Sequence, residues 1–246
     1  MMNIQKCVKI LEHKNADALV LLNEANMHYL CGFSPSEGMV VVLKNGDAFH
    51  LVDSRYTETA ENHAKETGLK VIEFKRSYYE ELAKIINNSK SKSIVYESNT
   101  ISLKAFENIK KHCKDAQMVE LGDLLMRERN IKEAEEIVLM KKANQIAEKA
   151  FLELLNHIKP GKTEKELAAY FDYLMAKEGS DGVSFDTILL AGERTSMPHG
   201  VPSKSTVKDG EFVLFDFGAT YQGYHSDMTR TVAVGSASDE MKEMYE

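Results

Sequence analysis

The first half of the chain alternates short apolar runs with polar segments of helical spacing. The apolar runs predict strands at residues 18–23, 39–43, 48–52, 69–74 and 93–97. The segments between them predict helices at residues 56–67, 79–86 and 103–112. Asn45-Gly46 separates two of the runs, and this dipeptide favours the tight turn of a β-hairpin. Strands and helices in this order predict a mixed sheet flanked by helices, an α/β (α+β) fold.

The second half opens with a long helical pattern and then changes to strands. Apolar residues recur three or four positions apart over residues 131–158, which predicts an amphipathic helix that ends at Pro160-Gly161. Thr163 and Glu166 have the spacing of a capping box, so we expect a second helix up to Gly179. Strands are predicted at 185–191, 211–220 and 224–234, and a helix begins at 238. Residues 118–130 form the expected passage between the two halves.

Two aspartates, Asp216 and Asp227, lie inside apolar strand patterns. A carboxylate in such a place is costly unless a positive group offsets its charge. A turn centred between Tyr221 and Gln222 would place the two aspartates directly opposite each other, with Cβ atoms about 5 Å apart. A divalent cation between them would remove their repulsion. The pair is therefore a candidate metal site, and its oxygen ligands suit hard or borderline cations.

Three further residues accompany the aspartates. His199 lies in a loop between Pro198 and Pro202, and such a stiffened loop suits a group that must be held in position. His225 and Thr229 share the strand alternation of Asp227, so both should point to the same face. We expect Thr229 to hydrogen-bond to the metal site and His225 to be a neighbour of it, not a ligand.

Three motifs in this order resemble a known enzyme family. They are Met-Pro-His-Gly at 197–200, Asp-Phe-Gly at 216–218 and Ser-Asp-Met-Thr-Arg-Thr at 226–231. Together they resemble the first half of a pita-bread metallopeptidase of the Xaa-Pro aminopeptidase and prolidase group. The resemblance implies a creatinase-like N-terminal domain over residues 1–126, with its mixed sheet. It also implies the N-terminal half of a pita-bread catalytic domain over residues 131–246.

The same resemblance implies hydrolysis of peptides that carry proline after the scissile bond. Asp216 would bind one of two divalent metal ions and Asp227 would bridge both. Mn²⁺ is the first expectation, with Co²⁺ or Zn²⁺ as alternatives. His199 would contact the substrate carbonyl or stabilise the tetrahedral intermediate. The expected substrate is a peptide with proline at its second position, and the expected assembly is a homodimer.

Composition narrows the class of protein. A net charge of −7 argues against nucleic acid or an anionic membrane as the main partner. The chain has 3 cysteines, widely spaced and odd in number, so they do not suggest a disulfide framework. No apolar run reaches the roughly 18 residues of a membrane span, and the N-terminus lacks the apolar core of a signal peptide. We therefore expect a cytoplasmic protein.

The chain also departs from the family it resembles. Family members carry three more metal ligands, a histidine and two glutamates, in the second half of the pita-bread domain, which would follow Glu246. We therefore expect a truncated form that is inactive alone. Two alternatives stay open: a non-catalytic pita-bread module that binds peptides or proteins, and a metal-free creatinase-type hydrolase. Asp216 and Asp227 argue against the second alternative, which needs no ligand carboxylates.

Overall fold

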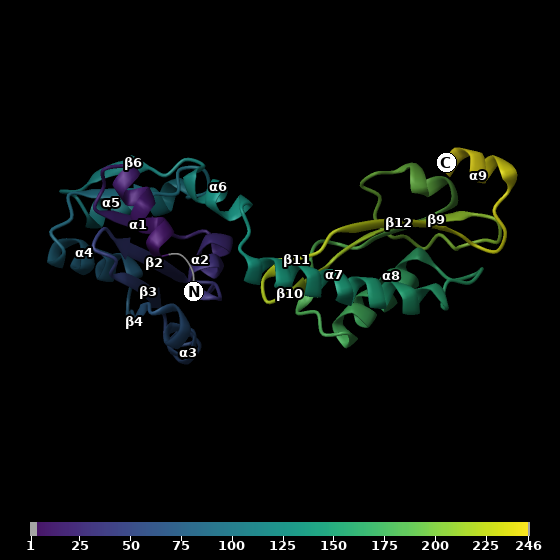
Figure 1. Cartoon of the computed structure of the whole chain (residues 1–246), viewed down its shortest axis with the longest axis horizontal. Helices are drawn as coiled ribbons and strands as arrows, with labels where there is room; N and C mark the ends of the chain where they lie inside the picture. The colour runs from purple at the N-terminus through teal and green to yellow at the C-terminus, as the bar shows by residue number, and fades with distance from the viewer. Residues whose placement is uncertain (1–3, 246) are drawn as a thin grey trace. The chain divides into compact units, whose positions relative to one another are not determined.

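The computed structural model describes residues 4–245, and the chain divides into two compact units, Met1–Ile131 and Lys132–Glu246 (Figure 1). Two clusters of buried apolar side chains lie in the first unit and another lies in the second. Each unit therefore has a core made from its own residues. None of the described helices is long and apolar enough to cross a membrane.

The first unit is built on a mixed sheet with strand order β4-β3-β2-β1-β5-β6. The strands are β1 (Ala18–Leu21), β2 (Gly38–Leu43), β3 (Ala48–Val52), β4 (Lys70–Glu73), β5 (Ser93–Tyr96) and β6 (Gln117–Glu120). The pairs β1–β2 and β2–β3 are antiparallel, and the other pairs are parallel. Every residue of β1 and β2 is buried, because both faces of these central strands are covered.

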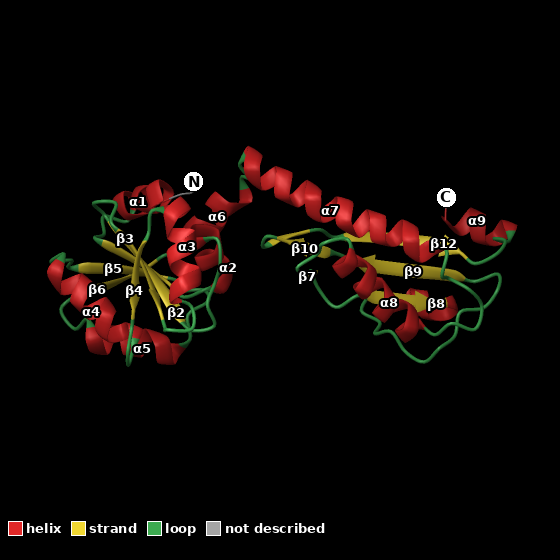
Figure 2. Ribbon diagram, turned by 90° about the horizontal axis from the view of Figure 1, so that it is seen from below, coloured by secondary structure: helices red, strands yellow, loops and turns green. Residues whose placement is uncertain are grey.

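Helices cover both faces of this sheet (Figure 2). They are α1 (Ile4–His13), α2 (Glu24–Cys31), α3 (Thr57–Thr67), α4 (Tyr78–Asn88), α5 (Leu103–His112) and α6 (Leu124–Asn130). One core contains Leu11 of α1, Leu30 of α2 and Leu125 of α6. The core on the other face contains Leu82 of α4 and Ile109 of α5. The predicted fold class, a mixed sheet flanked by helices, is confirmed.

Four elements of this unit were not among the predicted strands and helices. They are the helices α1 and α2 and, over the expected passage, the strand β6 at residues 117–120 and the helix α6. Two local signals mark α2: the Asn23 side chain accepts a hydrogen bond from the Asn26 amide, and Gly32 ends the helix at φ 79°. No such local signal marks β6. It forms a strand because it pairs with β5, whose residues are not its neighbours in the sequence.

The second unit places two long helices against antiparallel strands. The helices are α7 (Ala134–Leu155) and α8 (Glu164–Lys177). One sheet has the order β12-β9-β8 and the other β11-β10-β7. Their strands are β7 (Gly182–Val183), β8 (Ile188–Ala191), β9 (Phe212–Phe217), β10 (Ala219–Tyr221), β11 (Tyr224–His225) and β12 (Met228–Ala233). The 3₁₀ helix η1 (Gly192–Ser196) follows β8, and α9 (Asp239–Tyr245) follows β12.

Both helices lie on the same side of the β8–β9–β12 sheet (Figure 1). Phe151 of α7 and Phe171 of α8 meet Phe217 of β9, with ring centroids 5.5 and 4.6 Å apart. The start of α8 has the predicted capping box: Thr163 Oγ1 accepts from the Glu166 amide at 3.1 Å, and Glu166 Oε2 accepts from the Thr163 amide at 2.9 Å. That part of the prediction is confirmed.

The strands predicted at 211–220 and 224–234 each break in two. The first breaks at Gly218, between β9 and β10, and the second at Ser226 and Asp227, between β11 and β12. A Cβ atom on Gly218 would lie 1.9 Å from the Ser226 carbonyl oxygen. The two backbone segments therefore approach each other more closely than a residue with a side chain would allow. Beyond this point the hairpin continues as β10 and β11. These two strands belong to a second sheet, in which β10 also pairs with β7.

Candidate functional site

Asp216 lies on the face of β9 that points away from α7 and α8. Burial alternates along the strand: Val213, Phe215 and Phe217 are buried in the core, whereas Leu214 and Asp216 are half-buried on the opposite face. Thr229 Oγ1 of β12 donates a hydrogen bond to Asp216 Oδ1 at 3.1 Å. The expected hydrogen bond of Thr229 to the site is thus present, and it orients the Asp216 carboxylate.

Asp227 does not lie directly opposite Asp216, so the predicted register is wrong. Thr229 is the partner of Asp216, and Asp227 precedes β12 by one residue. The turn is centred one residue later than expected, at Gln222 and Gly223, which have φ 47° and 75°. A two-residue turn with positive φ at both central positions is of type I′. Glycine adopts positive φ readily and tyrosine does not, which favours Gly223 over Tyr221 as a central residue of the turn. Asp216 and Asp227 are therefore offset by two residues across the hairpin.

The backbone just before Asp227 is held tightly. Ser226 is 2% exposed, and its amide donates to the Ala219 carbonyl at 2.9 Å. Its hydroxyl oxygen accepts a hydrogen bond from the Ala219 amide, also at 2.9 Å. Together with the close approach of Gly218, these bonds fix the path of the chain into Asp227, whose side chain is exposed.

His199 is exposed on a turn between η1 and residue 205. Gly200 donates its amide to the Met197 carbonyl at 3.1 Å, which closes the turn around Pro198 and His199. A Cβ atom on Gly200 would meet Leu190 Cδ1 at 2.5 Å, so the loop backbone packs directly against the Leu190 side chain of β8. His225, by contrast, lies in β11, and its Nδ1 is 3.0 Å from Thr220 Oγ1 across the β10–β11 pair.

Glu164 is a residue that sequence reasoning missed. It is the first residue of α8 and is 0% exposed. Its carboxylate accepts hydrogen bonds from the Ala191 amide, the Arg194 guanidinium, and the amide and hydroxyl of Ser203. Burial acts to raise the pKa of Glu164, but the hydrogen bonds from Ser203, Ala191 and Arg194 outweigh it and hold that pKa below its usual range. The capping box located the start of α8, but nothing in the sequence marks the loop that Glu164 binds.

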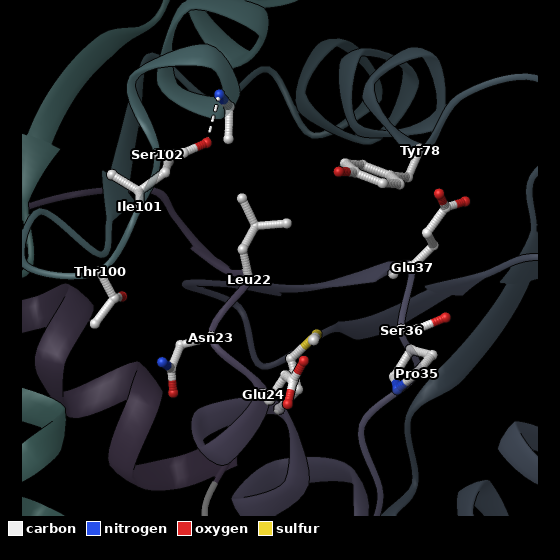
Figure 3. Close-up of a pocket in the computed structure, with 13 residues that line it drawn as sticks. Leu22, Asn23, Glu24, Pro35, Ser36, Glu37, Tyr78, Thr100, Ile101 and Ser102 are labelled. Atoms are coloured by element: carbon white, nitrogen blue, oxygen red, sulfur yellow. Dashed lines mark hydrogen bonds between the residues drawn. The ribbon is translucent and has the colours of Figure 1, made fainter.

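A separate hollow of about 270 Å³ lies in the first unit, beside the starts of α2 and α5 (Figure 3). Glu37 and Tyr78 stand on one side of it, with Ile101 and Ser102 on the other. None of the residues that line this hollow is a predicted site residue. His199, Asp216 and Asp227 all belong to the second unit.

The donor chemistry of the two aspartates fits a divalent cation in part. Carboxylate oxygens are suitable ligands for Mn²⁺ and similar ions. Within residues 4–245, however, no group of three or more histidine, cysteine, aspartate or glutamate side chains is placed to hold a metal ion. Asp216 and Asp227 could therefore supply part of a coordination sphere, and other ligands would have to complete it.

Comparison with known proteins finds a family match for each unit. Residues 138–246 match metallopeptidase family M24, and residues 3–131 match the creatinase/prolidase N-terminal domain. The uncharacterised peptidase YqhT of Bacillus subtilis is 35% identical over 245 residues, which cover 100% of this chain and 69% of that protein. The Xaa-Pro dipeptidase of Pyrococcus furiosus is 33% identical, over 99% of this chain and 68% of that protein.

Solved structures show the same relationship. The Xaa-Pro dipeptidase from Bacillus anthracis superimposes with a TM-score of 0.90 at 34% identity, over 99% of this chain and 68% of that one. The X-Pro aminopeptidase from Thermotoga maritima gives a TM-score of 0.88 at 37% identity, over 96% of this chain and 67% of that one. The chain thus spans about two thirds of each relative. It belongs to metallopeptidase family M24, a family of hydrolases, and carries the creatinase/prolidase N-terminal domain ahead of the M24 domain.

Proposed function

We propose that this chain takes part in metal-dependent cleavage of peptides that carry proline after the scissile bond. The observation that carries the proposal is the position of two aspartates within the region that matches family M24. Asp216 lies opposite Thr229 in the hairpin, and Asp227 is two residues before Thr229. The relatives named Xaa-Pro dipeptidase and X-Pro aminopeptidase support the substrate class. The bond before proline is a tertiary amide, so it benefits from a specialised site.

In this proposal the two aspartates supply oxygen ligands to divalent metal ions. Asp216 would hold one ion and Asp227 would bridge two, with Mn²⁺ the first candidate and Co²⁺ or Zn²⁺ the alternatives. Ions of this kind polarise a carbonyl and lower the pKa of bound water when they are present. The Thr229 hydroxyl, 3.1 Å from Asp216 Oδ1, keeps one carboxylate oxygen engaged and so limits rotation of the ligand.

His199 is the proposed substrate-binding group. Its ring is exposed at a turn that Gly200 closes against β8, so it is accessible to a peptide while its backbone is fixed. A hydrogen bond from the imidazole to the scissile carbonyl oxygen would stabilise the negative charge that develops there during attack. A donor at this place is most effective when the fold holds it in position, because it then needs no reorganisation during the reaction.

The proposal includes a cytoplasmic location and a homodimer. Cys7, Cys31 and Cys113 are free and buried, which is compatible with a reducing compartment. The net charge of −7 gives no support to a nucleic-acid partner. The dimer follows from the family resemblance alone.

Binding of Mn²⁺ to the 246-residue chain tests the proposed ligands. We expect weak binding by calorimetry, because two recognisable carboxylates leave most coordination positions to water, and we expect Asp227→Ala to abolish it. Asp239→Asn removes an exposed carboxylate from the same unit and should leave binding unchanged. Equal binding by the Asp227→Ala variant and the unaltered chain would show that the ion does not use this aspartate.

Turnover is the second part of this test. Release of the N-terminal residue from a proline-containing peptide should be negligible for residues 1–246 alone, with or without chelator, since two-metal catalysis needs both ions held in fixed positions. Chelator-sensitive turnover by this chain would mean that its own residues complete the site.

A second candidate function is peptide binding without hydrolysis. It is favoured by one observation, that residues 4–245 contain no group of three metal-binding side chains. Under this alternative, an Xaa-Pro peptide would bind equally well in chelator and in Mn²⁺, and Asp227→Ala would not weaken the binding. A fluorescently labelled peptide titrated under both conditions separates the two functions.

A further inference from the structure

We propose that Glu164 and Arg194 are positioning residues that hold the His199 loop in the shape needed to present its imidazole. The inference rests on the proposed role of His199 as the substrate-binding group. It assigns no contact with substrate to either residue. Their effect would pass through the loop of residues 191–203, named here the histidine loop, which runs from the end of β8 to Ser203.

Glu164 binds both ends of the histidine loop. At the near end its Oε1 accepts from the Ala191 amide at 2.9 Å. At the far end its Oε2 accepts from the Ser203 amide at 2.8 Å and from the Ser203 hydroxyl at 2.7 Å. His199 lies between these two anchors. One carboxylate therefore fixes the separation between the points where the loop leaves and rejoins the body of the unit.

Arg194 adds a second bond across the loop. Its Nε donates to Glu164 Oε1 and Oε2 at 3.0 and 3.1 Å. Its Nη2 donates to the Val201 carbonyl at 2.9 Å. Arg194 precedes His199 and Val201 follows it, so the guanidinium joins the two sides of the turn that carries the histidine. A planar group with donors in fixed directions suits this double role, and lysine cannot reproduce it.

The backbone of the histidine loop is held by more contacts than that of an ordinary surface loop. Glu164 is 0% exposed, so its charge persists only because hydrogen bonds surround it. Gly200 lies against Leu190 so closely that a Cβ atom would be 2.5 Å from Leu190 Cδ1. The loop is thus tied at both ends, across its middle and to the strand beneath it, while the His199 side chain itself stays exposed. An exposed ring on a constrained backbone is the arrangement expected of a positioned ligand-binding group.

Hydrogen exchange in the 246-residue chain tests the inference without metal or substrate. We expect Arg194→Lys to raise amide exchange over residues 195–203 by roughly tenfold, because loss of the Val201 bond frees the turn. Glu164→Gln should raise exchange over the whole histidine loop by at least a similar factor. Glu166→Gln removes a carboxylate from the same helical turn whose hydrogen bonds go to Thr163, so exchange in the histidine loop should stay at the wild-type level.

A histidine signal separates positioning from a general loss of stability. In Arg194→Lys the imidazole resonance of His199 should shift or broaden, while those of His157 and His225 in the same unit should not move. Arg194 is partly exposed, so its replacement should leave the fold intact even if Glu164→Gln fails to fold. Unchanged exchange over residues 195–203 in Arg194→Lys, with an unchanged His199 resonance, would overturn the inference.

The outcome is independent of the proposed function. Exchange and resonance report on the loop even if no Mn²⁺ binding or turnover is ever found. Where turnover can be measured, Arg194→Lys should lower kcat, and the same replacement made together with His199→Ala should have no further effect. Additive losses in the double variant would show that Arg194 acts by a route other than His199.

Discussion

Gly218 shows at the residue scale how a position without a side chain determines where a functional side chain lies. It lies between β9 and β10, and a Cβ atom there would be only 1.9 Å from the Ser226 carbonyl oxygen. Ser226 is directly followed by Asp227. A larger residue at 218 must therefore move the segment between β11 and β12, which contains the proposed bridging ligand.

We expect Gly218→Ala to lower the free energy of unfolding by about 1–3 kcal/mol, as overpacking against a rigid backbone does. Chemical denaturation measures the loss, and weaker Mn²⁺ binding should accompany it. Gly182→Ala is the matched control, since a Cβ atom there meets nothing within 4 Å. Equal stability of the two variants would mean that the close approach at Gly218 is easily relieved.

His50 is a residue whose burial makes stability depend on pH. It lies in β3, is 2% exposed, and its Nε2 has no hydrogen-bond partner among the described residues. Its ring centroid is 5.0 Å from that of Phe33. Burial, helped by the charge of nearby His63, lowers the pKa of His50 to about 4.

The sign of the resulting pH dependence follows from proton binding. An unfolded histidine has a pKa of about 6.5, so between that value and about 4 the unfolded chain binds the extra proton. Stability contributed by neutral His50 is therefore lost as pH falls. We expect wild-type stability to fall by about 2–3 kcal/mol more than that of His50→Phe between pH 7.5 and 4.5. Urea unfolding at both values measures this, and parallel losses in the two proteins would contradict it.

At the element scale, the Gln222-Gly223 turn sets the register of the hairpin. Both residues have positive φ, so the turn is of type I′ and brings Tyr221 opposite Tyr224. That pairing, carried back along the hairpin, brings Asp216 opposite Thr229. The relation between the two aspartates thus depends on the backbone conformation of two turn residues that lie several positions away from either aspartate in the sequence.

Gly223→Ala should destabilise the protein by about 1–2 kcal/mol, because alanine is strained at φ 75°. Gly223→Asn should cost clearly less, since asparagine tolerates the left-handed conformation. Thermal unfolding of the two variants provides the comparison. If asparagine and alanine were equally costly, lost turn geometry would not explain the effect.

At the scale of the whole molecule, the chain consists of two units that divide after Ile131. In the first unit, cores on both faces of the sheet draw only on residues of that unit. In the second, the core joins α7 and α8 to β8 and β9. Such an arrangement is typical of domains that fold separately.

We expect limited proteolysis to cut between residues 130 and 134, because this stretch links the two units and is exposed. Two protected fragments should result, and the N-terminal fragment should keep its helical circular dichroism once separated. Mass spectrometry of the fragments locates the cut. First cleavage inside either sheet would contradict the division into two independent cores.

Local patterns in the sequence were enough for much of the fold. The spacing of apolar residues located α7, and the Thr163–Glu166 capping box located the start of α8. Asn45-Gly46 correctly indicated the β2–β3 hairpin, where Gly46 adopts φ 90°. Each of these signals acts between neighbours in the chain, so it can be recognised without knowing the tertiary structure.

The site divides in the same way. The sequence by itself identified Asp216, Asp227 and His199 as candidates and related their motifs to the family. Only the tertiary structure decided that Asp216 faces Thr229, that Gly218 is pressed against Ser226, and that Glu164 binds a loop some 30 residues further on. The physical reason is that a carboxylate in an apolar strand is unfavourable unless a partner group offsets its charge, so the sequence alone indicates that a partner exists. Which residue is the partner depends on strand register and loop path. Those are set by contacts between residues far apart in the chain, which no local pattern records.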